Sequence, residues 1–271
     1  MKRILALTLA AAMLLGGCGK LIPGRGNAEA AKNDQAAEEL AVTAAETTAA
    51  PTTEPTTVPT EPPVYRNPVN GQLLDAPFAG RIYATTVSNL RENLPHVGVT
   101  QADVVMEMYV NMNNVVRCLA LFSDIESVKA MGSTRSTRPI FNQIAQHYDL
   151  ILGHAGGSST ALADAKERGI ENFNVESWDV MQEVTTSYRD KEYKRSLENS
   201  LFGIGAGYKE YAEKQGWPQT LDRDYGFRFT EDGTPEGETA NSVNVTFTYR
   251  NNKKDTTMIY DESLGKYVYN Q

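Results

Sequence analysis

Short segments rich in apolar and β-branched residues recur after residue 80 and predict β-strands. They comprise residues 81–87, 103–110, 115–122, 128–131 and 150–152. An asparagine-rich connection, Asn111 to Asn114, separates the second segment from the third. Because asparagine accepts the backbone conformations of tight turns, we expect these two strands to form a hairpin.

Helical segments alternate with these strands. Residues 140–147 follow Pro139, a residue type favoured in the first turn of a helix. Residues 159–168 have a serine cap at their start and Gly169 at their end. A longer helix is predicted over residues 199–214, which Gly216 and Pro218 terminate. This order predicts an α/β or α+β fold over residues 64–225, with a mixed sheet and flanking helices.

The pattern changes after Gly226, where only strands are predicted. These are residues 227–229, 243–249, 256–260 and 266–269, with turns at Asp232-Gly233 and Asn251-Asn252. We expect residues 226–271 to be the beginning of a β-rich C-terminal domain. Since the sequence stops just after a strand, this domain is expected to be truncated.

The N-terminus has the three parts of a secretory signal, residues 1–18. Lys2 and Arg3 precede an apolar stretch too short to span a bilayer comfortably, and Leu15-Gly16-Gly17-Cys18 follows it. This tetrapeptide resembles a bacterial lipobox, in which Cys18 would receive a diacylglycerol and further acylation by a fatty acid such as palmitate. The alternative is an ordinary cleaved signal with an incidental cysteine. The lipobox predicts anchoring to the outer, extracytoplasmic face of the cell membrane.

Residues 19–63 predict a disordered Thr/Pro-rich stalk. Large apolar side chains are scarce there, and a Thr-Thr-x-Pro unit repeats near its end, so little surface can be buried to offset the ordering entropy. Proline favours extended backbone of ~3.1 Å per residue, which gives a reach on the order of 100 Å. Glycosylation of the threonines is an alternative to a plain spacer.

The overall charge limits the classes of partner. Lys+Arg 26 against Asp+Glu 34 gives a net charge of -8, which argues against nonspecific binding of nucleic acid. With Cys18 lipidated, Cys118 has no partner for a disulfide and is expected to be a small buried apolar residue, with a catalytic thiol as the alternative. Neither a metal site nor a cofactor is predicted.

Two loops that lead from a strand into a helix are candidates for anion binding. The first runs from Gly132 to Pro139 and carries Arg135, Ser136 and Arg138; the second carries His154, Gly156, Gly157 and Ser158. Guanidinium groups and the free amides of a helix start both bind phosphate or carboxylate. If the preceding strands are neighbours in one sheet, both loops open at the same edge, and Arg117 adds a third positive group.

A purely structural interpretation of these loops stays open. The arginines would then pair with Asp103, Glu107 or Asp124, and the two glycines would only permit a tight turn. His154 is a candidate general base, although no nucleophile or orienting carboxylate adjoins it in the sequence.

A set of segments in the folded part of the chain carries a family resemblance. They are Asn67-Pro68-Val69-Asn70-Gly71, Gln101-Ala102-Asp103-Val104-Val105, Val116-Arg117 through Ala120-Leu121-Phe122, Arg135-Ser136-Thr137-Arg138-Pro139, and Tyr148-Asp149 through His154-Ala155-Gly156-Gly157-Ser158. Together they resemble the YerB-like family of Gram-positive lipoproteins, a family of unknown function. The resemblance implies an extracytoplasmic, two-domain protein and no established reaction. The chain departs from the family at residues 195–199, where members have a His-Asn pair after an arginine.

Two functions of different class follow from these features. The first is a binding module that recognises an anionic envelope ligand or an envelope protein. The second is an envelope phosphotransferase or hydrolase, because the order of motifs is similar to that of LytR-CpsA-Psr enzymes. That similarity implies roles for Asp103, Arg117, Arg135 and Arg138, and whether the protein is an enzyme stays open.

Overall fold

The computed structural model describes residues 63–110, 116–231, 233, 237–249 and 252–270. The predicted signal peptide, Cys18, the stalk as far as residue 62 and the Asn111–Asn114 connection lie outside these residues, as do Asp232 and Asn251 of the two predicted turns. Residues Thr60–Gln271 form one compact unit. We call residues 60–271 the folded unit.

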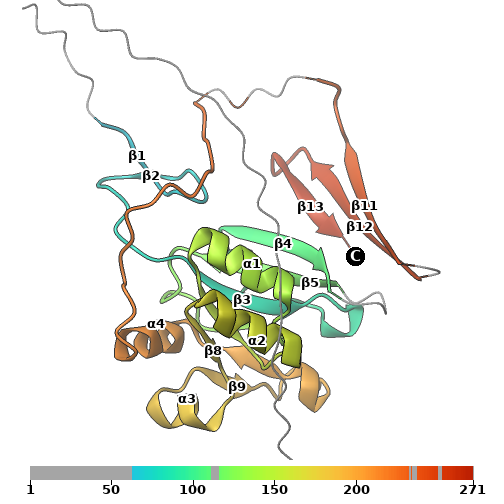
Figure 1. The fold of residues 1–271 in the computed structure, drawn as a ribbon. Helices are drawn as coiled ribbons and strands as arrows, with labels where there is room; N and C mark the ends of the chain where they lie inside the picture. The colour runs from blue at the N-terminus through green and yellow to red at the C-terminus, as the bar shows by residue number, and fades with distance from the viewer. Residues whose placement is uncertain (1–62, 111–115, 232, 234–236, 250–251, 271) are drawn as a thin grey trace, which may run out of the picture. The chain divides into compact units, whose positions relative to one another are not determined.

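The main sheet is mixed, as predicted, and has the strand order β4-β5-β3-β7-β8. Figure 1 labels β4, β5, β3 and β8 of this sheet. Its strands are β3 (Tyr83–Ser88), β4 (Val104–Tyr109), β5 (Val116–Phe122), β7 (Ile151–His154) and β8 (Asn172–Asn174). β4, β5 and β3 pair antiparallel, which confirms the predicted pairing of β4 with β5, whereas β3, β7 and β8 pair parallel. Every residue of β3 and β5 is buried, as expected for central strands covered on both faces.

Helices cover both faces of this sheet. The first face packs on α1 (Pro139–Tyr148), whose Phe141 and Ala145 join Leu119, Leu121 and Leu152 of the sheet in one apolar cluster. Helix α2 (Ser159–Arg168) lies beside α1 (Figure 1). The second face packs on α4 (Gly205–Lys214), and α3 (Trp178–Glu183) contributes Val180 to the same cluster. Because it has two hydrophobic cores of its own, the folded unit buries the apolar surface that independent folding needs.

Three smaller sheets complete the folded unit. A short hairpin joins β1 (Tyr65–Arg66) to β2 (Leu73–Leu74) across the predicted Asn67–Gly71 turn. The order β6-β10-β9 joins β6 (Met131–Gly132), β10 (Leu201–Gly203) and β9 (Ser187–Arg189). The C-terminal sheet, β11-β12-β13, consists of β11 (Ser242–Tyr249), β12 (Asn252–Asp261) and β13 (Lys266–Asn270).

The structure corrects three local predictions. The helix expected from residue 199 begins at Gly205, because residues 201–203 form β10 and pair with two distant strands. Residues 227–229 form no strand; Phe227 instead stacks on Tyr148, with ring centroids 5.8 Å apart. The strand predicted at 128–131 is reduced to β6, which belongs to a different sheet from β7.

Candidate functional site

The two candidate loops lie side by side, although the strands that precede them, β6 and β7, belong to different sheets. A parallel bridge joins Thr137 to Gly157, and the Thr137 amide donates to the Gly156 carbonyl at 2.9 Å. The Ala155 amide donates to the Arg135 carbonyl, also at 2.9 Å. Hydrogen bonds between their backbones thus hold the two loops together. The prediction had this depend on neighbouring strands in one sheet, whereas the preceding strands, β6 and β7, belong to different sheets.

Local sequence explains how each loop enters its helix. Arg138 is the N-cap of α1 in extended conformation, and Pro139 occupies the first turn, where its missing amide costs nothing. Ser158 caps α2, and its Oγ accepts a hydrogen bond from the Ala161 amide at 3.1 Å. This position requires a small oxygen-bearing side chain, so Ser158 has a structural role in starting the helix.

Arg117, Arg135 and Arg138 form a cluster of positive charge around the first loop. Arg117, the second residue of β5, is only 5% exposed, and its Nη1 donates to the Ser136 carbonyl. Arg138 donates to the Thr137 carbonyl at 2.7 Å. Only Arg135 has an ion pair, with the exposed Glu198; in the part of the chain that the structure describes, no carboxylate pairs with Arg117 or Arg138.

The electrostatics of the cluster reflect this shortage of counter-charge. Burial lowers the pKa of the Arg117 guanidinium, and the charges of Arg138 and Arg135 lower it further. Burial and the charge of Arg135 likewise lower the pKa of Arg138. Three guanidinium groups thus share one nearby carboxylate, that of Glu198, in a chain whose overall charge is negative. An anion placed beside them would relieve their mutual repulsion.

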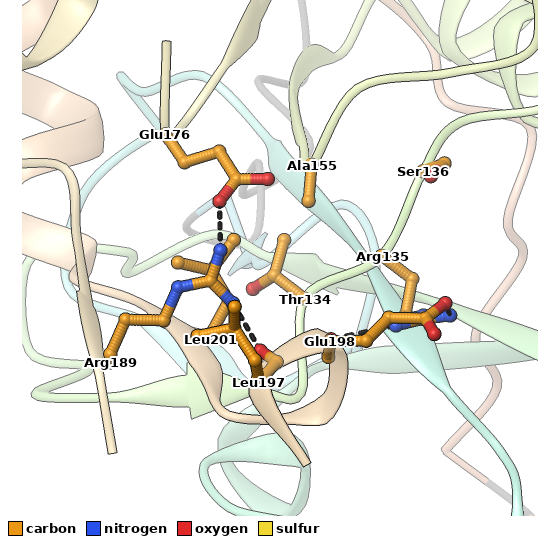
Figure 2. Close-up of a pocket in the computed structure, with 9 residues that line it drawn as sticks. All are labelled: Thr134, Arg135, Ser136, Ala155, Glu176, Arg189, Leu197, Glu198 and Leu201. Atoms are coloured by element: carbon orange, nitrogen blue, oxygen red, sulfur yellow. Dashed lines mark hydrogen bonds and ion pairs between the residues drawn. The ribbon is translucent and has the colours of Figure 1, made fainter. Parts of the chain in front are cut away.

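A cavity of about 380 Å³ opens beside the first loop. Figure 2 shows its lining, with Arg135 bonded to Glu198 and Arg189 bonded to Glu176 at separate places on the wall. Ser136 also lines it. Each of the two arginines that line the cavity pairs with a glutamate of the same wall, so the lining has no excess charge. Arg117 and Arg138 are not among the residues that line it, and the unpaired positive charge therefore lies beside the cavity, not in its wall.

The residues of the second loop are mostly engaged in structure. His154 is 2% exposed, its Nε2 lies 3.0 Å from Asn172 Oδ1, and burial lowers its pKa, so that the ring is neutral at pH 7. The Gly156 amide donates to Asn174 Oδ1 at 3.1 Å. A side chain at Gly157 would approach Leu162 within 2.9 Å, so this glycine allows close packing against α2.

The carboxylates considered as partners of the arginines lie in other networks. Asp103 accepts hydrogen bonds from the Asn70 side chain and the Ser123 amide. Glu107 pairs with Lys254 at 2.6 Å. Across the described ranges, no three His, Cys, Asp or Glu side chains are grouped as a metal site would require, and no helix there has the length and apolarity to span a membrane.

The far wall of the cavity was not predicted from the sequence. Glu176 follows β8, Arg189 ends β9, and Leu197 and Glu198 belong to a 3₁₀-turn at Leu197–Asn199. These are short elements brought together by pairings between residues far apart in the sequence, and no local motif marks them.

Comparisons with known proteins assign the chain to a family. The sequence model of the N-terminal domain of the family "Protein of unknown function (DUF3048)" matches residues 71–218. No curated protein matches the chain. The crystal structure of YerB protein from Bacillus subtilis is similar in fold, with a TM-score of 0.61 and 20% identity. That similarity covers 76% of this chain and 66% of the YerB chain. As the family model spans more than half of its residues, the chain belongs to the DUF3048 family and is YerB-like.

Proposed function

We propose that this protein is a lipid-anchored module on the extracytoplasmic face of the membrane that binds an anionic group of an envelope molecule. The anchor is the diacylglycerol expected on Cys18. The binding site is the arginine cluster, Arg117, Arg135 and Arg138, with the adjoining cavity. Phosphate and carboxylate are the groups that guanidinium recognises.

The observation that carries this proposal is the unpaired charge of Arg117. This side chain is nearly fully buried, has a backbone carbonyl as its hydrogen-bond acceptor, and has two further guanidinium groups as neighbours. Burying an unpaired charge is costly, so a site that retains one is suited to a ligand that supplies the missing anion. Arg138, half-buried and without a carboxylate of its own, is the cluster member open to such a ligand.

Thermal unfolding of the folded unit in the presence of inorganic phosphate or pyrophosphate tests the proposal, with chloride at matched ionic strength as the reference. A ligand at ten times its Kd stabilises the folded state by about 1.4 kcal/mol. For a domain of roughly 200 residues this corresponds to a rise in Tm of roughly 3–6 °C. We expect such a rise for the wild type and its loss in Arg138→Gln.

Arg228→Gln is the matched control. It also removes one positive charge, but from an exposed arginine that pairs with Asp224 four residues away. The control should retain the full rise in Tm. The proposal fails if the wild type shows no rise beyond chloride, or if Arg138→Gln and Arg228→Gln respond alike.

A further inference from the structure

A second and larger groove lies between the C-terminal sheet and β4. Its volume is about 1050 Å³. The walls are mainly apolar and include Leu94, Val99, Val105, Val245, Phe247 and Met258. The register of β11 with β12 pairs Val245 with Thr256 and Val243 with Met258, which puts these side chains on one face of the sheet. A concave, mostly apolar site of this size is typical of small-molecule binding.

The polar groups of this groove are concentrated around Glu107. Its side chain is 13% exposed, and its Oε1 accepts hydrogen bonds from Lys254 at 2.6 Å, Thr256 at 3.0 Å and Tyr269 at 3.2 Å. Asn89 donates to the same oxygen. All of these donors converge on Oε1.

The second oxygen of Glu107 is not used in this network. Oε2 has no hydrogen-bond partner among the residues that the structure describes. It is also not among the polar atoms there that are both fully buried and without a partner, so it is accessible. Since Glu107 lines the groove, Oε2 is an acceptor available to a molecule inside it. The Lys254 ammonium neutralises the carboxylate, so the groove offers a hydrogen-bond acceptor without a net charge.

We propose that this groove binds an uncharged amphiphile with an alkyl or aromatic body and a hydroxyl or N–H head that donates to Glu107 Oε2. The apolar walls take the body of the molecule. Because the ion pair with Lys254 already neutralises Glu107, a charged head of either sign would lose its hydration in the groove without gaining a counter-charge, whereas a neutral donor would not, so a neutral donor fits best. This site is separate from the arginine cluster, and its ligand class differs.

The test uses N-phenyl-1-naphthylamine, a neutral apolar fluorophore with one N–H donor. Its fluorescence should rise on addition of the folded unit. Competition with 1-decanol should reverse the rise, whereas decanoate and decylamine should compete at least tenfold more weakly. Equal competition by all three, or no rise at all, overturns the proposal.

Two glutamate substitutions on opposite faces of the C-terminal sheet locate the site. Val245→Glu introduces a charge into the groove and should abolish the fluorescence rise. Ile259→Glu is the matched control, because alternation along β12 puts Ile259 on the face opposite Met258, and both replaced side chains are partly exposed, 38% and 47%. Far-ultraviolet circular dichroism of both variants checks that they are folded. Equal binding by the two variants would overturn the proposal.

Glu107→Gln examines the head-group preference separately. The substitution leaves Lys254 without its carboxylate, so decanoate should gain affinity relative to 1-decanol. An unchanged order of competitors would show that Glu107 does not contact the ligand.

Size-exclusion chromatography tests the remaining alternative, in which the groove is an interface between two copies of the chain. If the wild type is a dimer that Val245→Glu dissociates, this alternative holds and the proposal is wrong.

Discussion

Replacing Arg117 by methionine should stabilise the folded unit and weaken anion binding at the same time. Arg117 is 5% exposed and lies near the start of β5, a strand whose every residue is buried. Methionine keeps most of the length of the side chain and its apolar contacts, and removes the charge. The substitution therefore separates the cost of burying the guanidinium from the packing of its stem.

The expected size follows from two opposing contributions. The desolvation cost of a buried unpaired ion is several kcal/mol, and it is removed together with the repulsion from Arg138 and Arg135. Against this, the hydrogen bond from the guanidinium to the Ser136 carbonyl is lost, which costs about 1.5–3 kcal/mol for a charged donor. We expect a net stabilisation of about 1–3 kcal/mol, or roughly 2–12 °C in Tm for a domain of this size.

Urea denaturation followed by tryptophan fluorescence measures the free energy of unfolding directly. Arg81→Met is the matched control, because Arg81 is also buried, at 3%, but pairs with Glu171 at 2.6 Å and donates to the Pro218 carbonyl at 2.7 Å. Removing one partner of such a pair is expected to destabilise the protein by about 3–5 kcal/mol. The two substitutions are chemically identical, and their effects should have opposite signs.

A fall of more than about 1 kcal/mol in the free energy of unfolding of Arg117→Met, the net value of an ordinary hydrogen bond, would contradict this prediction. Arg117 would then be a net stabilising link between β5 and the first loop. The unpaired charge would no longer need a ligand to explain it.

Further predictions concern single side chains. Gly153→Ala should destabilise the folded unit by about 1–3 kcal/mol in urea titrations, because the new Cβ would lie 2.3 Å from the buried ring of Tyr208. Burial lowers the pKa of His154 below the 6.5 of an unfolded histidine. The contribution of the neutral ring to stability is therefore present above pH 6.5 and is lost below it, by at most about 1.4 kcal/mol per pH unit. His154→Asn should accordingly flatten the decline of the urea midpoint between pH 6.5 and 5. Cys118 is 3% exposed and burial raises the pKa of its thiol to about 12, so peptide mapping should find it alkylated by iodoacetamide only when urea unfolds the protein. Finally, Cys18→Ser should release the expressed protein from the membrane fraction to the soluble fraction, as immunoblotting would show, and continued membrane retention would contradict the lipid anchor.

The elements that could be predicted from the sequence are those with strong local signals. Helix α2 has the predicted bounds, since Ser158 caps it and Gly169 ends it in the left-handed conformation that glycine favours. Strands β3, β4 and β5 were recognised because each is a long apolar or β-branched run. Local chemistry was sufficient in these places.

The elements that were missed depend on contacts between distant segments. β8, β9 and β10 are three residues long, too short for a periodic pattern, and β10 is a strand because β6 and β9 supply its hydrogen bonds. Arg135 and Arg138 were found because they stand three residues apart in one loop, and Arg117 because it lies on a strand that precedes this loop in the sequence. The glutamates and Arg189 of the cavity wall were missed because tertiary structure alone brings them there.

The backbone of the first loop is tied to its surroundings on both sides. The Arg135 amide donates to the Thr86 carbonyl at 2.9 Å, and the Arg135 carbonyl accepts from Ala155. A loop held in this way is preorganised, so an anion would find its binding groups already in position. We therefore expect capture close to the diffusion limit, with a rate that falls as ionic strength rises. Structures with and without the anion should superimpose closely at this loop.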